Sequence, residues 1–235
     1  MAQHHMPKFA TNGLIMYLDA GNRASYAGSG TTWRDMTQSG NSCTLYGSPV
    51  YSGDNLGYLT FSSAASNFAE NASPVGLIGN VAVTLSCWVY PTTMNGGNQA
   101  VLNYGGDATI GDTFAINLYT DTRAWSMAFN GANDMISNAS AYTVNTWNYL
   151  VATKTPGAAN TTTKLYVNGS EIAVATTTTV TPNVVARVIR VGRWVFNSQP
   201  SYFNGRVSCA TIHNRALTAS EVLQNFNATR GRFRV

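Results

Sequence analysis

Charged side chains are scarce in this chain. Only 10% of its 235 residues are Asp, Glu, Lys or Arg, against about a quarter in an ordinary globular domain. The net charge of +4 is scattered except at the C-terminus, where Arg230, Arg232 and Arg234 alternate with Gly231 and Phe233. A nucleic-acid-binding domain carries a denser basic stripe, so we do not expect a nucleic-acid partner. A surface with so little charge repulsion favours assembly with other proteins.

Cysteines are few and long apolar runs are missing. Cys43, Cys87 and Cys209 form no close pair of the kind that binds zinc. Cys87 shares the apolar face of Val83–Tyr90 and is interpreted as a small buried hydrophobe, while the sequence leaves open whether any two cysteines pair. No segment approaches 18 consecutive apolar residues, and the start lacks the apolar stretch of a signal peptide. We expect no membrane partner and synthesis in a reducing cytoplasm.

Short apolar runs separated by turn residues fill most of the chain, a pattern typical of β-strands. The pair Asn168-Gly169 is the strongest turn signal, because both residues tolerate positive φ. A hydrophobic fraction of 44% in a chain of this size suffices for the core of one sandwich. The expected strands are Leu14–Leu18, Tyr58–Phe61, Val81–Tyr90, Ala100–Tyr104, Phe114–Tyr119, Trp125–Phe129, Tyr149–Lys154, Thr163–Val167, Val188–Val191 and Arg206–Ile212.

One helix is expected near the C-terminus. Thr218 is a good N-cap, and Glu221 stands three residues later, where its carboxylate can reach back to the Thr218 N–H. Leu217 and Val222 flank this capping box in the positions of a hydrophobic staple. The sequence therefore predicts that a helix begins directly after Thr218.

The closing segment resembles a known family. Phe203-Asn204-Gly205-Arg206-Val207, followed by Ile212-His213-Asn214-Arg215-Ala216-Leu217-Thr218, resembles the last strand and helix of concanavalin A-like, laminin-G-like jelly-roll domains. The runs Val83–Val89, Trp147–Thr153 and Lys164–Gly169 resemble the central strands of that family. The continuation through Gln224–Phe233 is similar to proteins of tailed bacteriophages.

This resemblance implies an all-β fold. We expect an antiparallel β-sandwich of the concanavalin A-like jelly-roll type with one short C-terminal helix. The expected division of the chain is an N-terminal arm at residues 1–12, the sandwich at 13–229 and a basic tail at 230–235. The tail is either a solvated terminus or an arm whose Arg230, Arg232, Phe233 and Arg234 dock on a neighbouring subunit.

Catalytic patterns are absent from the sequence. Glycoside cleavage needs two carboxylates across one cleft, but Glu70, Glu171 and Glu221 are the only glutamates, and none has an acidic partner at strand spacing. No Gly-x-Ser-x-Gly elbow and no phosphate loop occurs. His213 is interpreted as a packed strand residue. We therefore predict that the protein is not an enzyme.

Two kinds of ligand site remain as candidates. The resemblance implies that calcium could be held by loop carboxylates, and Asp107, Asp112 and Asp134 are the candidates, although loop aspartates more often make turns. No other cofactor is expected. Sugar binding would use an exposed aromatic ring beside polar side chains, and the candidate pairs are Trp33 with Asp35 and Trp194 with Asn197. The alternative for each Trp is packing in the core or between subunits.

The leading functional hypothesis follows from the phage-like ending. We expect a structural protein on the surface of a bacteriophage virion, such as a capsid decoration or head-fibre subunit, made in the host cytoplasm. Its expected partners are copies of itself, the major capsid or tail protein, and host surface glycans. The alternative is a carbohydrate-binding module or a receptor-binding tail component.

Overall fold

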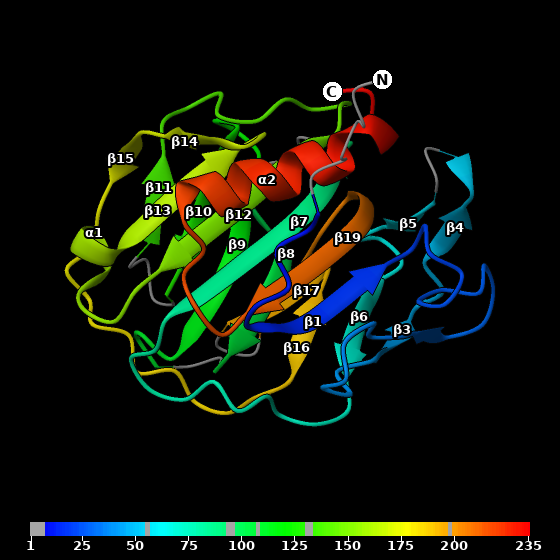
Figure 1. Ribbon diagram of the computed structural model, residues 1–235, viewed down its shortest axis with the longest axis horizontal. Helices are drawn as coiled ribbons and strands as arrows, with labels where there is room; N and C mark the ends of the chain where they lie inside the picture. Colours follow the sequence, from blue (N-terminus) through cyan, green and yellow to red (C-terminus); the bar gives the residue numbers. More distant parts are fainter. Residues whose placement is uncertain (1–7, 55–56, 93–96, 107–108, 130–133, 197–198) are drawn as a thin grey trace, which may run out of the picture.

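A computed structural model describes residues 8–54, 57–92, 97–106, 109–129, 134–196 and 199–235. In these residues the strands form two large antiparallel sheets that face each other across the main core (Figure 1). One carries the long C-terminal helix on its outer face and is called the helix-side sheet. The other carries a small hairpin on its outer face and is called the hairpin-side sheet. The structure thus confirms the antiparallel β-sandwich predicted from the sequence.

The helix-side sheet has the strand order β14-β13-β12-β7-β19-β5-β4, with β1 also paired to β19. Its central strand is buried on both faces, so it reads as a nearly continuous apolar run. The strands are β1 (Leu14–Asp19), β4 (Val50–Ser52), β5 (Tyr58–Phe61), β7 (Val83–Pro91), β12 (Asn148–Lys154), β13 (Thr163–Val167), β14 (Ser170–Ile172) and β19 (Gly205–His213).

The hairpin-side sheet has the order β15-β11-β10-β9-β8-β16-β6-β3-β2. Its strands are β2 (Thr32–Trp33), β3 (Cys43–Tyr46), β6 (Phe68–Asn71), β8 (Asn98–Gly105), β9 (Thr113–Tyr119), β10 (Ala124–Ala128), β11 (Asp134–Ser137), β15 (Val174–Thr176) and β16 (Ile189–Val191). A separate hairpin consists of β17 (Arg193–Phe196) and β18 (Gln199–Tyr202). The remaining elements are α1 (Ala159–Thr162), α2 (Ala219–Thr229) and a 3-10 turn (Arg230–Arg232).

The long apolar strands match the expected ranges to within two residues at each end, and the Asn168-Gly169 turn joins β13 to β14 with φ of 50° and 83°. Short, polar strands such as β3 and β6 were not predicted. They lack long alternation, and their pairing depends on neighbours far along the chain.

The predicted capping box is confirmed. The Glu221 N–H donates to Thr218 Oγ1 at 3.2 Å, and the Thr218 N–H donates to Glu221 Oε2 at 2.9 Å. Arg215 also donates to both oxygens of this carboxylate, at 2.9 and 2.6 Å. The hydrogen bonds from Arg215 are the main reason why the pKa of Glu221 is lowered to about 2. The helix therefore begins at a cap that is itself fixed to the end of β19.

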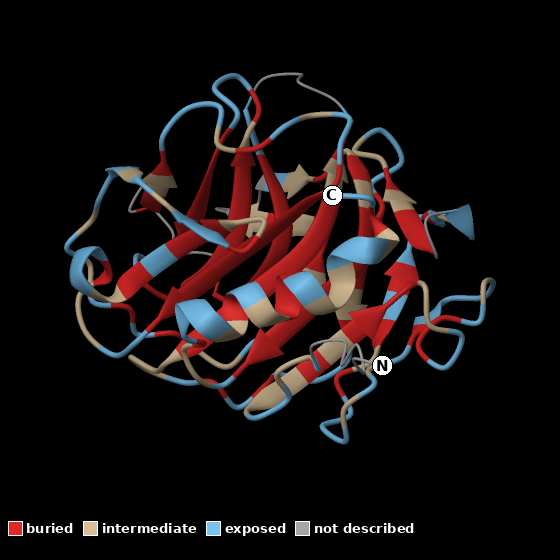
Figure 2. Ribbon diagram, turned by 45° about the horizontal axis from the view of Figure 1, so that its top comes forward, coloured by how far each residue is buried: buried red, intermediate tan, exposed pale blue. Residues whose placement is uncertain are grey.

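A second apolar core lies between α2 and the helix-side sheet. Trp88 projects outward from β7, while Cys87 projects into the main core as predicted. One face of α2 is buried and the other exposed (Figure 2). Leu223 lies on the exposed face with 46% of its area accessible. The buried members of this second core are Tyr58, Trp88, Trp147, Tyr149, Val151, Tyr166, Cys209, Leu217, Val222, Phe226 and Phe233.

The C-terminal tail folds back on its own chain. The Phe233 ring is buried, with its centroid 4.1 Å from that of Trp88 and 4.8 Å from that of Trp147. Arg232 pairs with Asp19 through two hydrogen bonds of 2.8 and 2.9 Å. The predicted docking of these two residues on a neighbouring subunit is therefore corrected, because their contacts are made within the chain. Arg230 and Arg234 are exposed, and for them an assembly contact stays a prediction.

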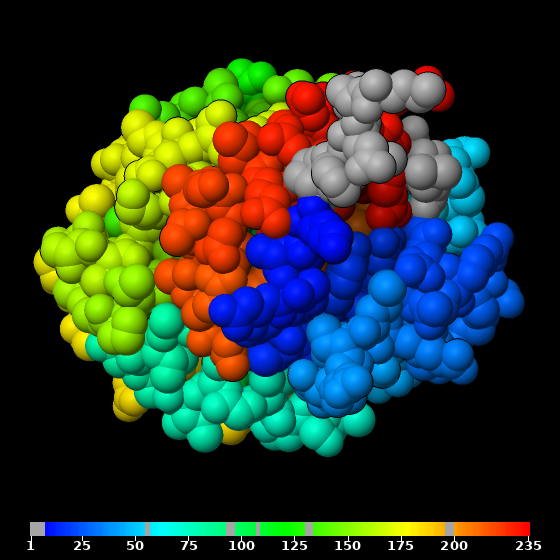
Figure 3. Space-filling view, viewed as in Figure 1, coloured from blue at the N-terminus to red at the C-terminus, as the bar shows by residue number. Residues whose placement is uncertain are grey.

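The N-terminal segment lies against α2. The Ala10 N–H donates to Asn225 Oδ1 at 2.7 Å, and the Ala10 carbonyl lies 2.9 Å from His213 Nε2. His213 is fully buried, as expected of a packed strand residue. In Figure 3 the blue N-terminal residues lie beside the orange and red residues that follow β19. No helix in the described ranges is long and apolar enough to span a membrane.

The three cysteines are free and buried. Burial raises the pKa of the thiols of Cys43, Cys87 and Cys209. The sequence left open whether any two of these cysteines form a disulfide, and in the structure none of them does.

Candidate functional site

The first predicted sugar-binding pair lies inside the fold. Trp33 on β2 has no exposed area and belongs to the main core. Asp35 accepts hydrogen bonds from the backbone N–H groups of Tyr17, Thr37 and Asn41 at 2.9 to 3.0 Å. The prediction that Trp33 offers a face for a sugar is therefore corrected, and Asp35 fastens the surrounding loop.

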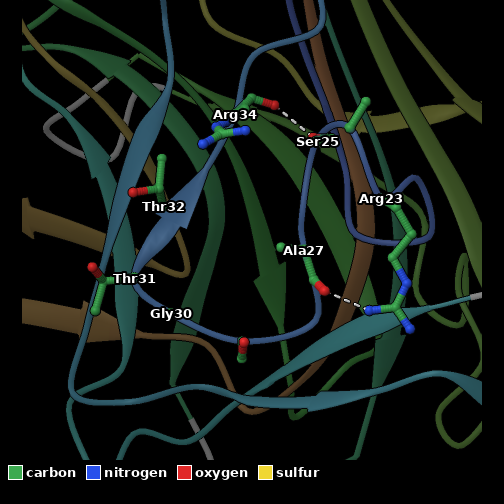
Figure 4. A pocket seen from close by; sticks show the side chains of 9 residues that line it. Arg23, Ser25, Ala27, Gly30, Thr31, Thr32 and Arg34 are labelled. Carbon is green, nitrogen blue, oxygen red and sulfur yellow. Dashed lines mark hydrogen bonds between the residues drawn. The ribbon is translucent and has the colours of Figure 1, made fainter.

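The residues on either side of Trp33 line a small pocket of about 160 Å³, called the arginine pocket (Figure 4). Arg23 donates to the Ala27 carbonyl at 2.6 Å, and Ser25 donates to the Arg34 carbonyl at 2.5 Å. The two guanidinium groups lie apart, on different sides of the pocket, so they do not converge on one position. The pocket is cationic but is not arranged around a single anion.

The second predicted pair is on the separate hairpin. Trp194 lies on β17, is only 8% exposed, and packs on Ala100, Ala115 and Ala128. Asn197 lies outside the described residues. As it stands, the Trp194 ring faces the sheet and does not offer a free surface for stacking.

The other strand of the same hairpin borders an open groove of about 360 Å³, called the amide groove. Its side-chain amides are held in place: Asn204 bonds both the N–H and the hydroxyl of Ser63 at 2.8 Å, and Gln99 accepts from the Asn204 N–H at 2.9 Å. Ser201 donates to the Asn98 carbonyl at 2.5 Å. The groove is lined by Ser63, Asn98, Gln99, Pro200, Ser201, Tyr202 and Asn204.

An aromatic strip adjoins this groove. Tyr202 borders the groove, and its ring centroid lies 6.4 Å from that of Phe68, which in turn stacks on Tyr46 at 4.6 Å. Arg193 lies over the Phe68 ring at 4.6 Å and is 5.9 Å from the Tyr202 ring. Tyr46 is 43% exposed, and Phe68 and Tyr202 are half-buried. Three partly exposed rings therefore lie in a row beside fixed amides.

This combination suits a polyhydroxylated ligand. Side-chain amides and hydroxyls both donate and accept hydrogen bonds, and aromatic rings supply apolar contact at low entropic cost. In the sequence, Trp194 and its polar neighbour point to this hairpin, but nothing points to Tyr202, Phe68 or the amides. Their positions along the chain are too far apart for a local pattern to join them.

The three aspartates predicted for calcium do not form a described site. Asp107 lies outside the described residues. Asp112 is buried and accepts from the Thr109 N–H at 3.1 Å. Asp134 accepts from the hydroxyls of Tyr119 at 2.6 Å and Ser126 at 3.2 Å, and burial raises its pKa. Within the ranges that the structure covers, no three His, Cys, Asp or Glu side chains gather as metal ligands would.

Comparisons with known proteins agree with the fold. The family model described as the concanavalin A-like lectin/glucanases superfamily matches residues 57–223, more than half of the chain. No curated protein matches the sequence. Among solved structures, the chain is similar to Trypanosoma rangeli sialidase in complex with sialic acid, with a TM-score of 0.65 and 16% identity. That match covers 94% of this chain and 33% of the sialidase chain.

The chain is also similar to the binding domain of botulinum neurotoxin DC in complex with rat synaptotagmin II. The TM-score is 0.63 and the identity 14%, over 92% of this chain and 52% of the toxin chain. A third similar structure is that of botulinum neurotoxin type C, whose cell entry depends on two ganglioside molecules, with a TM-score of 0.63 and 13% identity. It covers 92% of this chain and 51% of that one.

One prediction from the sequence needs correction here. The protein was predicted not to be an enzyme, and this is contradicted because the solved structures of similar fold include sialidases and a mutant with trans-sialidase activity. The chain spans about a third of the length of those enzymes, and at 16% identity the likeness shows the fold and assigns no catalytic residue. The family model matches more than half of the chain, and the β-sandwich and the capped helix agree with it. The chain therefore belongs to the concanavalin A-like lectin/glucanases superfamily.

Proposed function

We propose that this protein binds glycans through the amide groove and the aromatic strip. The observation that carries the proposal is the placement of three partly exposed rings beside amides that are fixed by hydrogen bonds. Fixed groups lose little freedom when a sugar binds, which favours affinity. The volume of about 360 Å³ also lies at the lower end of the usual range of ligand sites, roughly 300–1,000 Å³.

Two of the similar proteins support the choice of ligand class. The sialidase was solved in complex with sialic acid, and cell entry of the neurotoxin depends on interaction with gangliosides. Both are glycans or carry them, so a carbohydrate ligand is consistent with the fold as well as with the groove. The amide groove itself is lined by uncharged side chains, so we expect recognition of sugar hydroxyls.

Tyr202→Ala should weaken glycan binding. The Tyr202 ring joins the groove to the aromatic strip, so its loss should weaken binding at least tenfold, which is about 1.4 kcal/mol. A glycan array that compares the wild type with the variant measures this, and thermal unfolding checks that both are folded.

The control is Arg23→Ala combined with Arg34→Ala in the arginine pocket. This variant should retain glycan binding. If binding is lost there and retained in Tyr202→Ala, the site is the arginine pocket and the proposed groove is wrong.

We further propose that the glycan-binding domain is displayed on a bacteriophage particle. The support is the resemblance of the closing segment to phage proteins, together with a surface of low charge. Attachment would be through protein contacts with capsid or tail subunits, and copies of the chain would assemble with one another. Immunogold electron microscopy of intact particles should show this chain on the virion surface. Particles without the label would remove the virion role and leave the glycan proposal standing.

A further inference from the structure

Arg193 lies against the aromatic strip, next to the amide groove. Its guanidinium carbon is 4.6 Å from the centroid of the Phe68 ring and 5.9 Å from that of the Tyr202 ring. Arg193 and Tyr202 stand opposite each other in the register of β17 and β18, and Tyr202 also lines the groove. The guanidinium is therefore beside the ring that joins the strip to the groove.

The charge of Arg193 has no acceptor within the described part of the chain. Its Nε is buried and has no hydrogen-bond partner, and the residue forms no ion pair there. Three other partly buried arginines, Arg190, Arg215 and Arg232, each pair with a carboxylate at 2.6 to 2.8 Å. A buried N–H of a charged group without an acceptor is costly, and such groups are rare enough to require an explanation.

Glu70 is already occupied by another arginine. It stands two residues after Phe68 on β6, so both side chains are on the same face of the sheet. Its carboxylate accepts from Arg190 at 2.6 Å, and the two charges balance each other. Among the described residues, the charge of Arg193 therefore remains unbalanced, and an acceptor from outside the chain would satisfy it.

The aromatic rings hold the guanidinium without using its hydrogen bonds. A guanidinium over an aromatic ring is attracted to the face of the ring, and its N–H groups form a planar fork that matches the two oxygens of a carboxylate. Arg193 is partly exposed, so a ligand in the groove can reach this fork. A held guanidinium also loses little freedom when the ligand binds.

We propose that Arg193 binds the carboxylate of an acidic sugar, so that the protein prefers acidic glycans to neutral ones. The inference rests on the proposed glycan-binding function and adds the class of its ligand. The sugar ring packs on the aromatic strip, and the hydroxyls reach the amides of the groove. Uronic acids and sialic acids both carry such a carboxylate, and the experiment below separates these two sources.

The test compares acidic oligosaccharides with the same molecules after their carboxyl groups have been reduced to alcohols. The probes are sialyl-lactose and an oligogalacturonate, and calorimetry measures their affinities. The wild type should bind at least one acidic probe about tenfold or more tightly than its reduced form, because a hydrogen bond between charged groups is lost on reduction. Arg193→Gln should bind the acidic probe as weakly as the reduced one, with the affinity for the reduced probe unchanged.

Arg206→Gln is the matched control. Arg206 is also partly buried and lies over two rings, those of Tyr58 and Tyr90, at 4.7 and 4.5 Å. These rings belong to or pack on the second core, outside the groove. The control removes the same charge and should keep the preference for the acidic probe. An equal loss in both variants would mean that only net charge matters, and the assignment of Arg193 would be wrong.

Salt gives a second readout on the unmodified protein. The affinity for the acidic probe should fall as salt rises, because salt screens partly exposed charges, and the affinity for the reduced probe should not. If acidic and reduced probes bind equally, the inference is wrong and the glycan function stands. If no probe binds, the proposed function fails and the inference with it. If a folded Arg193→Gln loses both kinds of probe, Arg193 only supports the rings and the inference is again wrong.

Discussion

Phe233→Ala should destabilise the protein by about 3–5 kcal/mol, the range for truncating a buried phenylalanine. The ring lies between Trp88 and Trp147 and closes the second core at its outer edge. Its removal leaves a cavity that two rigid indoles cannot fill. For a chain of this length the melting temperature should fall by roughly 10 °C. Urea unfolding at 25 °C measures the free energy directly.

The matched control for this truncation is Leu223→Ala on α2. Leu223 is a large apolar residue in the same part of the chain, but 46% of its area is exposed. Its truncation should cost well under 1 kcal/mol beyond the helix propensity of the two residues, since little area is returned to water. Equal losses for the two variants would mean that the tail contributes nothing specific to stability.

Asp19→Ala should cost about 3 kcal/mol or more, because it leaves a largely buried guanidinium without its carboxylate. The side chain of Asp19 is 8% exposed and that of Arg232 is 18% exposed. Asp19 also accepts from the Gly21 N–H at 2.9 Å, so the turn after β1 loses a fixed point as well. Chemical unfolding of Asp19→Ala, Arg232→Met and the double variant measures the coupling between the two side chains.

The double variant should be more stable than the sum of the two single losses implies, by at least 1 kcal/mol. The exposed pair Lys164–Glu171 provides the comparison, with side chains 57% and 46% exposed. Lys164→Met should change stability by less than about 1 kcal/mol. A strictly additive cycle for Asp19 and Arg232 would show that the tail is not fastened by this ion pair.

The tail illustrates what a sequence can predict. The capping box of α2 involves residues within a few positions of each other, and it was predicted correctly. The alternation of Arg and Phe after the helix looked equally distinctive, but its meaning depended on partners elsewhere. Asp19 is 213 positions away from Arg232, and no local pattern joins the two. A motif formed by neighbouring residues can therefore be predicted from the sequence, whereas an ion pair between residues far apart in the chain cannot.

The same reason explains the outcome at the candidate sugar sites. Trp33 and Trp194 were chosen because they stand beside polar residues, but a strand sends alternate side chains to opposite faces, and here both indoles face inward. The partly exposed aromatic rings are instead those of Tyr46, Phe68 and Tyr202, each from a different strand. Which aromatic side chains are exposed depends on which strands become neighbours, and the short polar strands gave no signal of that.

The three buried thiols can report in which order parts of this protein unfold. Cys43 lies in a strand near the edge of the hairpin-side sheet, Cys87 in the middle of the main core, and Cys209 beneath the C-terminal tail. All three sulfurs are buried, so an alkylating reagent reaches each of them only when the packing around it opens. The order in which the three cysteines are modified then reports the order in which the edge of the hairpin-side sheet, the C-terminal tail and the main core open. No residue has to be substituted for this measurement.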